Sequence, residues 1–221
     1  MITIPVICLG VLCFLMAIVY TIYGKKGGWQ GLLVRGLAIL SCIGLVQVCA
    51  SLKSLTNVLP IFVTIGLAIL LLGEAIKVVG VASDKAQNVT TGILNSLGFI
   101  SISLGGLTLS EFSLFALLGS IFFGVAFGFI LCAIKKYKTK EKIFMEILSF
   151  TSIGFILGFG LMAVLSSSHT FSAYCMLGGG LILLFQKFML ALGKGGKAIS
   201  YIGNALYILA LTAISFSIYL Y

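Results

Sequence analysis

The chain has 221 residues, of which 61% are hydrophobic and only 9% are charged. A soluble domain carries about 25% charged residues, so this composition excludes an ordinary soluble protein and indicates an integral membrane protein. The formal net charge of +9 is a sign of membrane orientation rather than of nucleic-acid binding, because positive residues collect on the cytoplasmic side of membrane proteins.

Continuous apolar stretches, each close to the about 20 residues that a spanning helix needs, follow one another with short connections. Their continuity excludes a β-barrel, whose strands alternate apolar and polar residues. The first run is too long for a signal peptide and its lysines follow it. We therefore predict an all-α, polytopic transmembrane bundle forming one integral membrane domain over residues 1–221. The expected helices cover 2–23, 31–51, 59–81, 90–109, 113–134, 143–166, 173–192 and 200–220. Only Ser110, Glu111 and Phe112 separate the fourth from the fifth.

Loop lysines fall in alternate connections, which fixes the expected orientation. Ten lie after the first, third, fifth and seventh predicted helices, and only Lys53 lies in the other connections. The positive-inside rule then places these ten on the cytoplasmic side and both termini outside. The expected location is the cell membrane of a bacterium.

Six cysteines all lie in apolar stretches, without a CxxC pair or a histidine-rich tract. Buried, unreactive thiols are the favoured interpretation, and no metal or other cofactor is expected. His169 and Cys175 could suggest a cysteine protease, but no third group is available to orient the histidine, which argues against that interpretation.

Polar side chains within the helices are rare, and charges at membrane depth are costly and often functional. With the predicted orientation they gather in the cytoplasmic third of the membrane, which predicts a polar cavity opening to the cytoplasmic leaflet. Some of them could instead extend to the interface, form a local ion pair or bond neighbouring helices. The residues are Arg35, Glu74, Lys77, Asn95, Glu146, Gln186, Lys187 and Asn204.

Small residues recur at every fourth position of the fifth predicted helix, at Ser120, Gly124 and Gly128, and glycines also run along the sixth, at Gly154 and Gly158. This small-xxx-small spacing allows close approach of helix backbones, so helix packing is the expected role.

The third and seventh predicted helices end alike, with a polar residue at nearly the same place: Glu74 in ILLLGEAIKVVG and Gln186 in ILLFQKFMLALG. Because these helices are four apart, the halves 1–112 and 113–221 would be two parallel four-helix repeats.

The chain resembles the YhhN-type lysoplasmalogenase family of small eight-helix membrane proteins. GKKGGWQGLLVRGLAIL is similar to that family's basic loop and lysine-led second helix, with Arg35 in the lysine's place. Gly73 and Glu74 match a Gly-Asp signature with one extra methylene, and Phe185-Gln186 stands where Ser-Asp occurs. YIGNALYILALTAISFSI is similar to the family's tyrosine-rich last helix.

The resemblance implies cleavage of the vinyl-ether bond of lysoplasmalogens to a fatty aldehyde and a glycerophospho-base. This chemistry needs one carboxylic acid to protonate carbon and a carboxylate to stabilise the oxocarbenium ion and activate water. Glu74 supplies one acid, Gln186 can only orient water, and Glu146 is the candidate for the second acid.

The expected partner is a lysophospholipid or a related amphipathic lipid within the bilayer. Basic and amide side chains at headgroup level would bind it, because guanidinium and ammonium groups bind phosphate. These are Arg35, Lys77, Asn95, Lys187 and Asn204. Two alternatives to the hydrolase stay open: an inactive lysophospholipid-binding relative, and a small transporter or its binding subunit. The discontinuous helices of such transporters are not expected, since Pro5 and Pro60 lie at helix starts. The oligomeric state is left open.

Overall fold

The computed structural model describes residues 4–23, 28–52, 58–79, 84–109, 113–135, 139–166, 170–192 and 196–220. Over these residues the fold is all-α, as predicted, with eight helices long and apolar enough to cross a membrane. The helices are α1 (Ile4–Tyr23), α2 (Gly28–Leu52), α3 (Val58–Val79), α4 (Asp84–Gly106), the short 3-10 helix η1 (Leu107–Leu109), α5 (Leu114–Lys135), α6 (Lys140–Leu165), α7 (Thr170–Leu192) and α8 (Lys197–Leu220).

Several features of the sequence fall outside this description. They are Lys25, Lys26, Lys53, Lys136, Lys138, Lys194 and His169, the break at 110–112, and the side chains of Lys85 and Lys197.

The helices match the predicted stretches, with the largest difference at α4. This helix begins at Asp84, six residues before the predicted start at 90. The prediction began too late because the first turn and a half of α4 is polar, and the predicted helices were placed by their apolar residues. Gln87 in this extension donates from Nε2 to the carbonyl of Ile76 at 2.7 Å. That bond satisfies one of the carbonyls left over near the end of α3.

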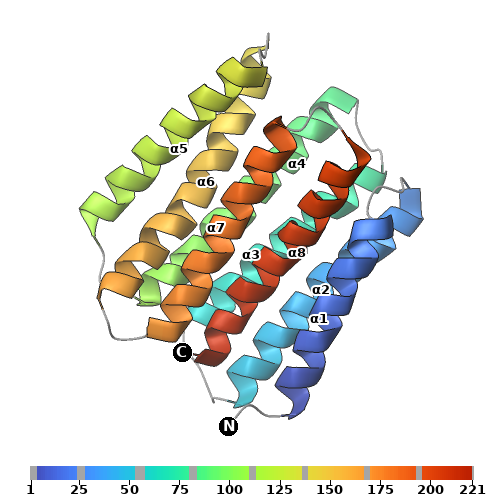
Figure 1. The fold of residues 1–221 in the computed structure, drawn as a ribbon, viewed down its shortest axis with the longest axis vertical. Coiled ribbons are helices and arrows are strands. Elements are labelled where there is room, and N and C mark those ends of the chain that lie inside the picture. The colour runs from blue at the N-terminus through green and yellow to red at the C-terminus, as the bar shows by residue number, and fades with distance from the viewer. Residues whose placement is uncertain are drawn as a thin grey trace.

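Seven helices form a ring in the order α1, α2, α3, α4, α6, α7 and α8, which returns to α1. α8 also contacts α2, and α5 lies outside the ring against α6. Figure 1 shows α5 at one edge of the bundle and α1 with α2 toward the other, and both ends of the chain at the same end of the bundle. We call the opposite end, where α1, α3, α5 and α7 finish, the polar end.

Glycines allow the closest helix contacts, as the small-residue spacing predicts. A methyl group at Gly128 would come within 2.8 Å of Cα of Ile147, and one at Gly154 within 2.7 Å of the Ser120 carbonyl, so α5 and α6 meet backbone to backbone. Gly66 and Gly98 join α3 to α4 in the same way.

The two halves share much of their neighbour pattern. Consecutive helices pack together within each half, and the contact of α2 with α8 corresponds to that of α6 with α4. α1 packs on α8, whereas α5 has no comparable contact with α4. The parallel repeat of 1–112 and 113–221 stays a prediction, and the outward position of α5 is where the halves differ.

Candidate functional site

Glu74 is the most deeply buried charged residue of the described chain, at 4% exposure. It lies near the end of α3, and each of its carboxylate oxygens accepts a hydrogen bond from a cation. Nη1 of Arg35 on α2 lies 3.1 Å from Oε2, and Nζ of Lys77 lies 2.6 Å from Oε1. A buried carboxylate is tolerated only when it is paired and hydrogen-bonded in this way. The three side chains form what we call the ion-pair triad.

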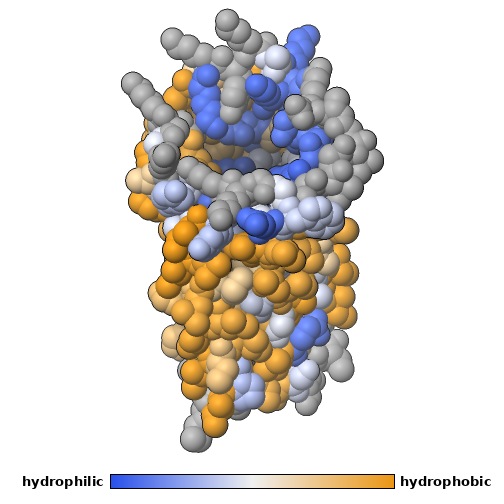
Figure 2. Space-filling model, turned by 90° about the vertical axis from the view of Figure 1, so that its right-hand side faces the viewer, coloured by the Kyte–Doolittle hydropathy of each residue, from blue (hydrophilic) through white to orange (hydrophobic). Residues whose placement is uncertain are grey.

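A cavity of about 150 Å³ lies beside the triad, between α1, α3, α4, α7 and α8. Six of its lining side chains are charged or carry an amide: Glu74, Lys77, Asn95, Gln186, Lys187 and Asn204. Three are aromatic: Tyr20, Phe99 and Tyr207. The cavity therefore collects six of the eight residues that the sequence singled out. Figure 2 shows a hollow at the polar end, with hydrophilic residues in and around it, above an apolar body.

Glu74 and Gln186 share this cavity, although α3 and α7 are not neighbours in the ring. They approach it from different walls. Gln186 is 8% exposed, and no hydrogen bond joins it to another described residue. An amide in this position can orient a ligand or a water molecule, but it cannot transfer a proton as a carboxylic acid does.

Asn95 reaches the cavity from α4 through the space left by a glycine. A methyl group at Gly73 would lie 2.9 Å from Oδ1 of Asn95. This oxygen is buried without a hydrogen-bond partner among the described residues, as is Oγ1 of Thr91 one turn earlier. An unmade bond of this kind costs about 1–3 kcal/mol. Because Asn95 lines the cavity, its oxygen identifies a place where a hydrogen bond from a ligand or a water molecule would be stabilising.

The electrostatic balance of the site is positive. Counted at their formal charges, Arg35, Lys77 and Lys187 contribute three positive charges and Glu74 one negative charge, a net of +2. Glu74 is already bound by two of these cations. Lys187 forms no ion pair with another residue of the described chain. The formal charges of the site therefore favour an anion.

Two predicted residues do not line the cavity. Arg35 is bound to Glu74, which does line it, as a member of the triad. Glu146 lies in the first turns of α6, where it pairs with Lys135 of α5 at 3.2 Å. Glu146 is not among the residues that line the cavity, and its suggested role as the second acid stays a prediction.

Sequence reasoning missed the aromatic lining. Tyr20 and Tyr207, whose ring centroids lie 6.4 Å apart, join α1 to α8 beside the cavity. Tyr207 follows Asn204 by three residues, so the two share a helix face. This spacing is the feature of the sequence that indicates Tyr207 as a lining residue.

No cysteine is among the residues that line the cavity. All six cysteines are free thiols. Among the described residues, no group of three histidine, cysteine or acidic side chains could hold a metal ion.

Comparisons with known proteins leave the site to be interpreted from its own geometry. No protein-family model matches the chain, and neither a curated protein nor a solved structure matches it.

Proposed function

We propose that the protein binds the headgroup of a single-chain phospholipid in the cavity at its polar end. The observation that supports this most is the net positive formal charge of the site, in which Lys187 has no ion-pair partner in the described chain. With the orientation expected from the loop lysines, the cavity opens to the cytoplasmic leaflet. Phosphate groups of lipids lie at that level, and lysine and arginine side chains bind them well.

The size of the cavity supports a headgroup rather than a whole lipid. A volume of about 150 Å³ equals roughly five water molecules in the liquid. A phosphate with a short substituent fills such a space, and the single alkyl chain would stay among the apolar side chains of the helices and bilayer.

Binding is tested with lysophosphatidylethanolamine and the purified full chain in detergent. We expect Lys187→Met to weaken binding about ten-fold or more, because a charge-assisted hydrogen bond contributes about 1.5–3 kcal/mol. Lys142→Met is the matched control, since Lys142 is exposed on α6 and its loss removes the same charge away from the cavity. Equal affinities of the two variants would overturn the proposal.

Vinyl-ether hydrolysis, as in the lysoplasmalogenases that the chain resembles, is the second candidate. Its support is that Glu74 and Gln186, at the places of the family's two aspartates, line one cavity. Glu74, held by Arg35 and Lys77, is suited to stabilise a cationic intermediate or to activate water. The proton donor is the missing part, because Gln186 cannot serve as one.

Aldehyde release from a lysoplasmalogen separates the two candidates. Under the hydrolase hypothesis the wild-type protein releases aldehyde and Glu74→Gln loses at least about 100-fold of the rate. If native mass spectrometry shows that the wild-type protein retains the intact lipid and no aldehyde is released, the protein binds the lipid without hydrolysing it.

The transporter alternative is the least supported of the three. Each spanning helix of the described chain is continuous, whereas such transporters build their sites from broken helices.

A further inference from the structure

We propose that an apolar groove on the outside of the bundle is a binding site for one acyl chain of a membrane lipid. The groove has a volume of about 630 Å³ and lies between α5, α6 and α7. It is separate from the polar cavity, and the inference does not depend on the proposed headgroup function.

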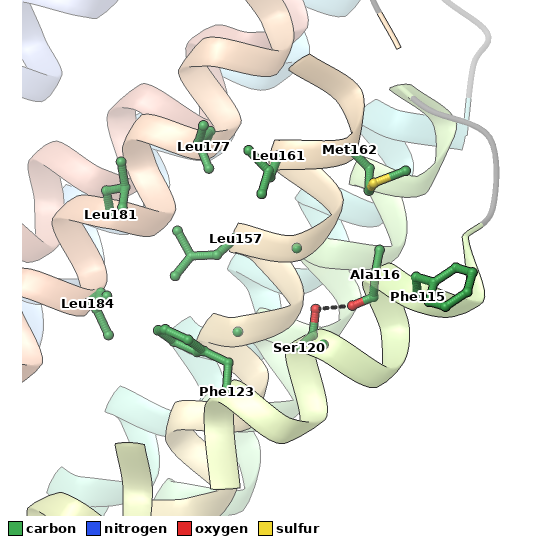
Figure 3. Close-up of a pocket in the computed structure, with 13 residues that line it drawn as sticks. Phe115, Ala116, Ser120, Phe123, Leu157, Leu161, Met162, Leu177, Leu181 and Leu184 are labelled. Atoms are coloured by element: carbon green, nitrogen blue, oxygen red, sulfur yellow. Dashed lines mark hydrogen bonds between the residues drawn. The ribbon is translucent and has the colours of Figure 1, made fainter. Parts of the chain in front are cut away.

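The groove exists because α5 stands outside the helix ring. α5 packs closely on α6 but meets α7 over only a few residues, so a space remains on the membrane side of the contact. Figure 3 shows Phe123 of α5 and Leu157 of α6 directed toward Leu181 and Leu184 of α7 across this space.

The lining offers no hydrogen bond to a ligand. Ser120 is its one hydroxyl residue, and that hydroxyl donates to the carbonyl of Ala116 at 2.6 Å within α5. The remaining lining residues are apolar or glycine. Since α5, α6 and α7 are spanning segments, the groove faces hydrocarbon, and its occupant has to be apolar along its length.

An alkyl chain fits the groove better than a partner helix does. Helices associate in membranes through small residues that allow close backbone approach. The small residues here are already used, because Gly154 and Gly158 of α6 pack on Ser120 of α5. Of the three glycines that line the groove, only Gly119 has space where an added methyl group would meet nothing within 4 Å. A volume of about 630 Å³ equals roughly twenty water-sized groups, enough for one flexible chain of methylenes.

The test uses the full chain in vesicles of phosphatidylethanolamine and phosphatidylglycerol. The vesicles contain a trace of phospholipid with a photoactivatable diazirine midway along one acyl chain. After illumination, labelled residues are mapped by mass spectrometry. We expect Leu157, Leu161 and Leu181 to be labelled above Leu15 and Leu40, which are also lipid-facing, being 51% and 48% exposed near the middle of α1 and α2.

Gly119→Leu places a branched side chain in the groove, and Gly10→Leu on α1 is its control, since an added methyl group would meet nothing within 4 Å at either glycine. Labelling of the groove leucines should fall at least about five-fold in Gly119→Leu and stay unchanged in Gly10→Leu, as overpacking costs at least about 1 kcal/mol. Uniform labelling around the wild-type bundle would overturn the proposal, whatever the folding of the variants.

Discussion

At the scale of single residues, Glu74 explains how the site keeps a charge inside an apolar bundle. Its two oxygens are satisfied by Arg35 from another helix and by Lys77 from the next turn of its own. The two cations leave the triad positive, and Lys187 adds a further charge across the cavity. The triad therefore stabilises Glu74 and at the same time gives the cavity its preference for anions.

Removing the interhelical partner should destabilise the protein. We expect Arg35→Met to lower the free energy of unfolding by about 2–3 kcal/mol, because breaking a buried pair leaves its charge partly uncompensated. The loss stays at this level because Lys77 still binds Glu74. Thermal unfolding in detergent measures it.

The control for this prediction is Lys142→Met, which should change stability by no more than about 0.5 kcal/mol, as for other exposed positions. An Arg35→Met protein as stable as this control would mean that the triad contributes nothing to the fold.

The sequence predicts part of this residue-level picture. The matched depths of Glu74 and Gln186 indicate a shared site, because a polar group buried without a polar partner costs free energy. Depth says nothing of rotation about the helix axis, however. Glu146 turns toward α5 and Tyr20 turns toward the cavity, and helices that are apolar on most sides carry no pattern that would reveal either.

At the scale of elements, α5 differs most from the other helices. It is the one spanning helix of the described chain that lies outside the ring, and it is attached mainly through α6. Apolar continuity predicts its existence and length, and the spacing of Ser120, Gly124 and Gly128 predicts its close contact with a neighbour. Neither feature predicts that α5 leaves the ring, because that depends on how all the helices fit together.

The α5–α6 contact should depend on its glycines. A methyl group at Gly124 would collide with the backbone of Thr151, so Gly124→Leu forces the helices apart. We expect a loss of about 2–3 kcal/mol in stability, at the upper end of the cost of overpacking. The thermal midpoint in detergent reports this loss.

Gly10→Leu adds the same side chain where even a methyl group would meet nothing within 4 Å, and its midpoint should match the wild type. If Gly124→Leu also matches the wild type, α5 is not held by backbone contact with α6.

At the scale of the whole molecule, polarity is concentrated at one end. The cavity, the triad and the Lys135–Glu146 pair all lie toward the polar end, and both chain ends lie at the other (Figure 1). Hydropathy alone predicts the number of spans, and the lysine distribution predicts their direction across the membrane.

This orientation is testable by cysteine labelling in intact cells. Thr139 and Ser166 are exposed residues at opposite ends of α6. A membrane-impermeant maleimide should label Ser166→Cys in intact cells and Thr139→Cys only after permeabilisation, with the wild-type protein giving the background of its own cysteines. The reverse pattern would place the polar end outside.

The central claim is that the cavity recognises a phosphate headgroup, and the most direct measurement compares two ligands of the wild-type protein. Native mass spectrometry should show retention of lysophosphatidylethanolamine and little of a monoacylglycerol with the same chain, because only the first carries the anion that Lys187 can bind. The expected preference is about ten-fold or more, from one charge-assisted contact. Equal retention of both lipids would show that the chain alone is recognised and would contradict the account.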